Sequence, residues 1–411
     1  MRWVIVALVL AVSALPASAQ TAPILVGERR LCSALDEIAE AANAARAAEA
    51  ARVRSMACQL PVDDIDPGWA EALLTDRPLQ FERARDVLTV VARSERDEVW
   101  LCCSLHTQMT RLGNSNYFAA RFRLAELDRA LLYFIPTDRV GRRVPDSDKV
   151  VYRGPDAPSA PALMLNGALE GQVVETTLWS TELDETRKLV IYLPPGHAAD
   201  AEYAALVVAD GDSVHYYARM IEPMIAAEEI APLVLIGIPS GQDGIVEDRS
   251  ALNLDLRAAD YLPAFEGAGD RFDRHMRFVT DTLLPFAERE YGVTQDRARR
   301  GVDGFSNGAV FAYWAGVLRP DLFGVALVRS SGYRGDANVE QLENPMRARF
   351  LMSAGMYETR FWVSTQRRAE ALRAAGYDVT FRSLAAGHAP DQGNIAFADF
   401  VRMAFPPRRE G

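Results

Sequence analysis

Cysteine is scarce in this chain of 411 residues, and its placement restricts the chemistry available. The four cysteines are Cys32, Cys58, Cys102 and Cys103, all in the first part of the chain. No motif pairs one of them with a base, which argues against a cysteine nucleophile. A zinc site is disfavoured because adjacent cysteines on a strand point to opposite faces. An even number in an exported protein favours structural disulfides.

The chain also lacks an excess of positive charge. It has 45 Lys and Arg against 56 Asp and Glu, a net charge of −11, and a sequence pI near 5.1. No run of Lys or Arg interleaved with aromatic residues appears. Nucleic acid is therefore excluded as an expected partner.

Long hydrophobic runs are absent beyond the N-terminus. Residues 4–15 are apolar, Arg2 precedes them, and an A-x-A pattern ends at Ala19. This arrangement is typical of a cleavable secretory signal, and the run is shorter than the ~20 residues that span a bilayer. We expect a signal peptide over residues 1–19, no stable membrane insertion after its cleavage, and a periplasmic or secreted mature protein.

Composition divides the remaining chain into four stretches. Residues 20–66 contain an Ala-rich helical pattern from 28 to 58, which predicts one long helix or a helical hairpin. Short β-type runs between polar turns predict a small β-sandwich over 67–140. Polar residues with Pro and Asp indicate a linker over 141–165.

From 166 to 411, short apolar runs alternate with longer amphipathic stretches, such as 272–290. This alternation predicts βαβ units, and hence an α/β domain with a mostly parallel sheet and helices on both faces.

The strongest motif is G-x-S-x-G at residues 304–308, between a predicted strand and a predicted helix. A nucleophile elbow needs a sharp turn there, and the glycines allow close backbone approach while the serine is exposed. We predict that Ser306 is the nucleophile. The alternative is a chance Gly-rich turn.

A serine nucleophile needs a base, and the chain has only five histidines. In α/β-hydrolases the order along the chain is serine, acid, histidine. Only His388, in a Gly-His turn after a predicted strand at 379–384, follows Ser306. We predict it as the general base, against the alternative of a solvated loop histidine.

The acid should follow a strand between these two residues and accept the imidazole N–H. Glu358 does so after a predicted strand at 349–352. Asp378 is the less favoured alternative, because it leads directly into the next strand.

Backbone N–H groups can hold the oxyanion of an ester intermediate. We predict the N–H of Asn307, the residue after the nucleophile, and the N–H of Asp212, in the Asp-Gly-Asp turn that ends an earlier strand. An ordinary turn is the alternative for Asp212.

With these residues placed, the segment from about Gly167 to Pro406 resembles the esterase family that includes enterochelin esterases, esterase D and feruloyl esterases. The motifs that carry the resemblance are the hairpin at 180–196, the Asp-Gly turn at 210–211, R-A-A-D-Y at 257–261, G-F-S-N-G at 304–308 and Gly-His at 387–388. The resemblance implies an α/β-hydrolase fold and places Arg257 at the substrate cleft, with a surface or structural arginine as the alternative. Residues 78–137 resemble the immunoglobulin-like domain that precedes the hydrolase in enterochelin esterases.

These features predict a serine carboxylic ester hydrolase that needs no metal and no organic cofactor. The resemblance suggests a siderophore-type oligoester as substrate. Alternatives are a feruloyl or acetyl esterase acting on polysaccharide, an acyltransferase, and a non-catalytic protein that binds a glycan or siderophore. A hydrolase fragment beginning near residue 161 is expected to keep activity on small activated esters.

Overall fold

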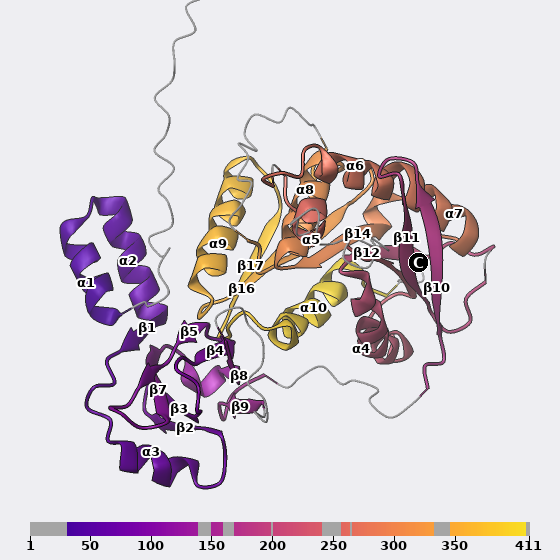
Figure 1. The fold of residues 1–411 in the computed structure, drawn as a ribbon. Helices are drawn as coiled ribbons and strands as arrows, with labels where there is room; N and C mark the ends of the chain where they lie inside the picture. Colours follow the sequence, from indigo (N-terminus) through magenta and orange to yellow (C-terminus); the bar gives the residue numbers. More distant parts are fainter. Residues whose placement is uncertain are drawn as a thin grey trace, which may run out of the picture.

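The computed structural model describes residues 31–138, 149–158, 168–198, 200–240, 256–263, 265–332 and 346–407 (Figure 1). The predicted signal peptide, residues 1–19, lies outside the described residues. An N-terminal part with two small sheets precedes a C-terminal part with one large sheet. No helix among the described residues is both long enough and apolar enough to cross a membrane.

The Ala-rich segment forms a helical hairpin, and not one long helix. Helix α1 (Cys32–Ala41) is followed by α2 (Ala44–Met56). The helix is interrupted between them, because the side chain of Asn43 caps the start of α2 by accepting the N–H of Arg46 at 3.1 Å. The helical stretch expected over 28–58 ends too late, since β1 (Ala57–Leu60) already pairs with a later strand.

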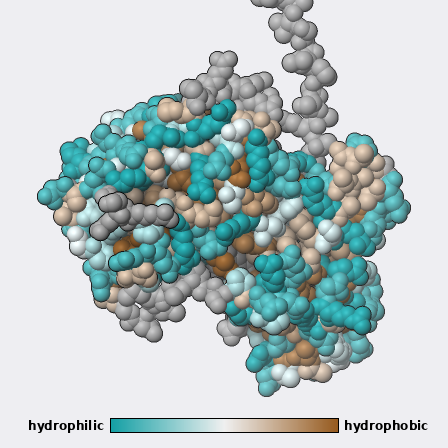
Figure 2. All heavy atoms as spheres, turned by 180° about the vertical axis from the view of Figure 1, so that it is seen from behind, coloured by the Kyte–Doolittle hydropathy of each residue, from teal (hydrophilic) through white to brown (hydrophobic). Residues whose placement is uncertain are grey.

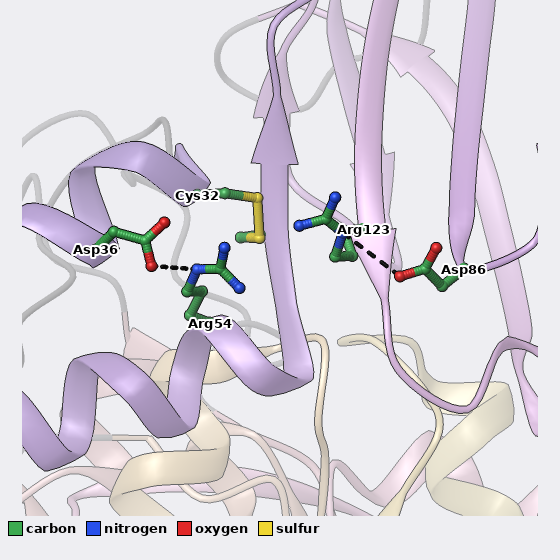
Figure 3. The surroundings of a disulfide bond; sticks show 6 residues. Cys32, Asp36, Arg54, Asp86 and Arg123 are labelled. Carbon is green, nitrogen blue, oxygen red and sulfur yellow. Dashed lines mark ion pairs between the residues drawn. A yellow bond between two sulfur atoms is a disulfide. The ribbon is translucent and has the colours of Figure 1, made fainter. Parts of the chain in front are cut away.

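A disulfide ties this hairpin to the first strand. Cys32, at the start of α1, is bonded to Cys58 on β1 (Figure 3). An ion pair between Asp36 and Arg54 joins α1 to α2 beside it. The expected disulfide bonding is confirmed for this pair, and Cys102 is disulfide-bonded as well.

The N-terminal part contains two antiparallel sheets that share one core. The first has the order β1, β7 (Tyr117–Leu124), β3 (Val87–Arg93) and β2 (Leu79–Ala84), with β6 (Thr110–Arg111) beside β7. The second has the order β5 (Thr107–Gln108), β4 (Trp100–Cys103), β8 (Leu131–Thr137) and β9 (Val150–Arg153). Buried apolar side chains from both sheets, such as Val90 and Phe134, belong to one cluster.

Two elements of this part differ from the sequence expectation. Strand β9 lies inside the stretch expected to be a linker, because its apolar residues pair with β8 despite the polar segments around them. Helix α3 (Pro67–Leu74) lies inside the expected β-sandwich, and Asp66 caps it by accepting the N–H of Gly68 at 2.8 Å. A short 3₁₀ turn at Leu127–Arg129 precedes β8.

The C-terminal part is built on an eight-stranded sheet. Its order is β10 (Gln172–Ser180), β11 (Glu185–Leu193), β13 (Leu233–Ile238), β12 (Ala204–Ala209), β14 (Arg300–Phe305), β15 (Val325–Arg329), β16 (Arg349–Gly355) and β17 (Val379–Leu384). The β10–β11 hairpin is antiparallel, and β11 is antiparallel to β13. From β13 to β17 the neighbouring strands are parallel, so their carboxyl ends meet at one edge.

Helices cover both faces of this sheet. They are α4 (Val214–Ala226), α5 (Leu256–Tyr261), α6 (Arg271–Arg277), α7 (Leu284–Tyr291), α8 (Asn307–Leu318), α9 (Thr359–Ala374) and α10 (Pro390–Ala404), with a π-helical stretch (Phe278–Leu283) between α6 and α7. Alternate residues of β12 belong to two different apolar clusters: Val207 packs with α8, whereas Leu206 packs with α4 and α10. Each β12 face is therefore buried, as in a doubly covered sheet.

The two parts are in contact through apolar side chains. Met356, Tyr357 and Trp362 of the C-terminal part belong to the apolar cluster of the N-terminal part. Figure 2 shows the reverse face, where hydrophilic residues cover most of both lobes and hydrophobic ones are visible where the lobes meet.

Candidate active site

Ser306 lies at a sharp turn between β14 and α8. Its backbone has φ 59° and ψ −120°, a conformation that a non-glycine residue rarely adopts. A Cβ on Gly304 would overlap the carbonyl oxygen of Gly308, so only glycine allows this close approach. The local geometry is that of a strained strand-to-helix elbow.

A buried ion pair supports this elbow from behind. The N–H of Ser306 donates to the carbonyl of Arg329 at 3.1 Å. The Arg329 guanidinium donates to both carboxylate oxygens of Asp303, at 2.8 and 2.6 Å, and to the hydroxyl of Tyr217. Burial by itself lowers the pKa of Arg329. The facing Asp303 carboxylate outweighs this effect, so the pKa of Arg329 is raised. Both charges are thereby compensated inside the core.

The predicted serine, histidine and acid come together in one hydrogen-bonded line. His388 Nε2 lies 3.1 Å from Ser306 Oγ, and His388 Nδ1 bonds to Glu358 Oε2. The three side chains come from the β14–α8 turn, the β17–α10 loop and the β16–α9 loop. Because β14, β16 and β17 run parallel in one sheet, their carboxyl ends bring the three turns to one edge of the sheet.

Glu358 is buried, and its second oxygen is held independently of the histidine. Oε1 accepts the N–H of Gly355 at 2.6 Å and the hydroxyl of Ser330. The carboxylate is thus fixed, with Oε2 directed at the imidazole. Asp378, the alternative acid, is not part of this arrangement: its exposed carboxylate pairs with Arg349 at 3.4 Å.

Two phenyl rings enclose the His388 imidazole. The ring of Phe361 is stacked on it at a centroid distance of 3.9 Å, and that of Phe305 at 4.8 Å. Stacking fixes the plane of the imidazole, so that its two nitrogens face Glu358 and Ser306.

The predicted oxyanion donors lie at the starts of two helices. Asn307 is the first residue of α8, and Asp212 lies in a 3₁₀ turn (Gly211–Ser213) that follows β12. The first N–H groups of a helix have no partner within it. The two turns are adjacent, since a Cβ on Gly308 would lie 3.3 Å from the Asp210 carboxylate. Asp212 itself is exposed and its carboxylate lies 3.4 Å from Lys188 Nζ.

Arg257, on α5, lies beside this turn. Its guanidinium donates to both carboxylate oxygens of Asp210, at 2.6 and 2.7 Å. Tyr261, one turn later, accepts the N–H of Asp210 at 2.8 Å and donates to the carbonyl of Ile238 at 2.9 Å. The segment at 257–261 therefore holds the backbone of the Asp210 turn, where Asp210 has a left-handed φ of 56°.

This geometry agrees with a comparison of the sequence with known families. Residues 180–381 match the Esterase family, described as "Putative esterase". The C-terminal part is an Esterase-family domain. The resemblance inferred from the motifs is thereby confirmed.

Other proteins and solved structures are similar to parts of this chain. Uncharacterized protein YjcH of Bacillus subtilis (strain 168) is 28% identical over 163 residues, which are 39% of this chain and 62% of that protein. The enterobactin esterase FES from Shigella flexneri has a TM-score of 0.56 at 16% identity, covering 83% of this chain and 98% of that chain. A ferulic acid esterase from Anaeromyces mucronatus has a TM-score of 0.50 at 13% identity, and the match covers 60% of this chain and 95% of that chain. These two structures show a shared esterase-type fold.

The remaining histidines have other surroundings. His106 stacks on Trp100, His197 contacts the carbonyl of Tyr291, His215 pairs with Glu175, and His275 is fully buried on α6. Sequence reasoning did not find Ser330, Phe305 or Phe361 as neighbours of the acid and the base. The one available signal was their position, since Phe305 and Phe361 are each within three residues of a predicted site residue.

Proposed function

We propose that the protein is an exported serine esterase that cleaves a carboxylic ester through an acyl-enzyme. The observation that carries this proposal is the line from Ser306 Oγ through His388 to Glu358. A serine hydroxyl is a weak nucleophile at neutral pH, and a base within hydrogen-bond reach, itself oriented by a carboxylate, activates it.

In the proposed reaction, Ser306 Oγ attacks the ester carbon while His388 Nε2 takes its proton. The N–H groups of Asn307 and Asp212 bind the oxyanion of the tetrahedral intermediate. Its collapse expels the alcohol, which takes the proton from His388 and leaves the acyl group on Ser306. Water then attacks the acyl-enzyme by the same route and releases the acid.

For the substrate, we propose a siderophore-type oligoester. The support is that the similarity to the enterobactin esterase covers 83% of this chain, whereas that to the ferulic acid esterase covers 60%. The larger share includes residues outside the hydrolase domain, where we interpret the two antiparallel sheets as an immunoglobulin-like domain. Arg257 is proposed to line the cleft, because its ion pair with Asp210 places it beside the turn that carries Asp212. Export is supported by the Cys32–Cys58 disulfide.

The test is a panel of esters offered to the purified protein: p-nitrophenyl acetate and butyrate, feruloylated sugars and a catecholate trilactone. The Ser306→Ala variant serves as the blank. We expect hydrolysis of the small esters and the highest kcat/KM for the trilactone. Equal hydrolysis by the blank would refute the proposed nucleophile, and a preference for feruloylated sugars would replace the proposed substrate class.

A further inference from the structure

The loops that carry the acid and the base form one unit. We call residues 355–358 the acid loop and residues 385–389 the histidine loop. The N–H of Met356 donates to the carbonyl of Leu384 at 2.8 Å, and that of Tyr357 donates to the carbonyl of Ala386 at 3.0 Å. A Cβ on Gly355 would overlap the carbonyl oxygen of Ala386. A shift of either loop is therefore transmitted to the other.

The N-terminal part contacts the backbone of the histidine loop. Leu131, the first residue of β8, forms an isolated parallel bridge with Ala386, and its N–H lies 3.4 Å from the carbonyl of Ala385. A Cβ on Gly387 would overlap the carbonyl oxygen of Ser104, just after β4. The residue before His388 thus packs directly against the N-terminal part, with no room for a side chain.

The N-terminal part also contacts the acid loop. Tyr357, the neighbour of Glu358, is 2% exposed, and its hydroxyl donates to the carbonyl of Ala125. Helix α9, which begins after Glu358, contacts α2 through a hydrogen bond of 3.0 Å between Arg52 and Gln366. The N-terminal part therefore holds the acid loop at Tyr357 and contacts the helix that follows it at Gln366.

We infer that the N-terminal part positions His388 and Glu358, so that both parts of the chain set the triad. This inference rests on the proposed esterase activity. A small misplacement of a base lowers the rate of the chemical step, and the supporting contacts decide how closely it is held. The effect does not depend on the size of the substrate. The structure thus argues against the expectation that a fragment beginning near residue 161 keeps its activity on small esters.

The test compares two tyrosine variants of the full-length protein. Tyr357→Phe removes the hydroxyl that joins the acid loop to Ala125. Tyr152→Phe is the matched control: Tyr152 is 4% exposed, and its hydroxyl donates at 3.2 Å to the carbonyl of Leu127, within the N-terminal part. Each variant loses one buried hydroxyl bonded to a backbone carbonyl, but only one of these bonds reaches the acid loop.

For Tyr357→Phe we expect kcat on p-nitrophenyl acetate to fall about tenfold with KM nearly unchanged. The downfield proton signal of the His388 Nδ1–H in the NMR spectrum should shift or broaden. Tyr152→Phe should keep kcat within about twofold and leave this signal unchanged. Wild-type kcat and signal in Tyr357→Phe, or an equal loss in Tyr152→Phe, would overturn the inference.

The two proposals fail separately in this design. Absence of wild-type activity on every ester, or equal activity in Ser306→Ala, refutes the proposed function. The imidazole signal needs no substrate, so it still decides whether the N-terminal part positions His388.

Discussion

At the scale of single residues, each part of the His388 ring contacts a different neighbour. Phe305 and Phe361 cover its faces, Glu358 bonds to Nδ1, and Nε2 is left for Ser306. Only the tautomer with the proton on Nδ1 presents a basic Nε2 to the serine. The acid therefore acts on catalysis through the histidine, by fixing its tautomer and stabilising the imidazolium.

Replacing this acid tests its assignment. We expect Glu358→Gln to lower kcat/KM by roughly 10²- to 10⁴-fold, because an amide can hold the imidazole in the wrong tautomer. Asp378→Asn is the control and should retain activity within about twofold, since its carboxylate is exposed and pairs with Arg349. Steady-state kinetics on p-nitrophenyl acetate checks both. The opposite pattern would transfer the role to Asp378.

The sequence predicted the three residues that the structure brings together because each has a signal of its own. Ser306 lies in a five-residue motif, His388 is the histidine that follows it, and Glu358 follows a predicted strand between the two. The hydroxyl of Ser330 and the ring of Phe361 were not predicted. Their contacts exist only after β15 and α9 pack beside the two loops, and no spacing in the sequence encodes that packing.

At the scale of elements, α6 carries an unusual buried group. His275 is fully buried between the rings of Tyr261, Phe278 and Phe311, and neither ring nitrogen has a hydrogen-bond partner among the described residues. Burial lowers the pKa of His275 to about 3. The unfolded chain, with a pKa near 6.5, takes up a proton before the folded chain does.

Stability should therefore fall as the pH falls from about 6.5 toward 3, by at most about 1.4 kcal/mol per pH unit from this residue. We expect His275→Leu to flatten the dependence, because leucine fits an apolar site and binds no proton. Urea unfolding of both proteins at about pH 7 and about pH 5 measures it. A stability difference between the two proteins that is the same at both pH values would contradict this account.

Elements with strong local patterns were predictable, and those defined by pairing were not. The runs at 87–92 and 117–122 became β3 and β7 because their apolar residues face a core. The first two residues of strand β1, Ala57 and Cys58, were assigned to a helix, since a four-residue strand directly after an Ala-rich helix carries no pattern of its own. Strand β9 was assigned to a linker for the same reason.

At the scale of the whole molecule, the Cys32–Cys58 disulfide fastens the helical hairpin that contacts α9. We expect Cys32→Ala/Cys58→Ala to lower the free energy of unfolding by about 2–4 kcal/mol, because the open chain gains conformational freedom. Asp36→Ala is the control, and loss of its ion pair with Arg54 should cost at most about 1 kcal/mol. Chemical denaturation checks both, and equal losses would show that the disulfide adds no constraint.

The contact between the two parts was beyond sequence reasoning. Ser104, Leu131 and Ala386 belong to no motif, and the polar composition between the parts indicated only a linker. Their contacts arise from the shapes of two folded surfaces, and apolar residues such as Tyr357 were equally compatible with the hydrolase core alone.

The central claim is that His388 and Glu358 activate Ser306, and covalent labelling tests it most directly. The wild-type protein would be treated with a fluorophosphonate, and the modified residue located by mass spectrometry. We predict one adduct, on Ser306, formed at least about a hundredfold more slowly in His388→Ala. An adduct on another serine, no adduct, or equal rates in the two proteins would contradict the account.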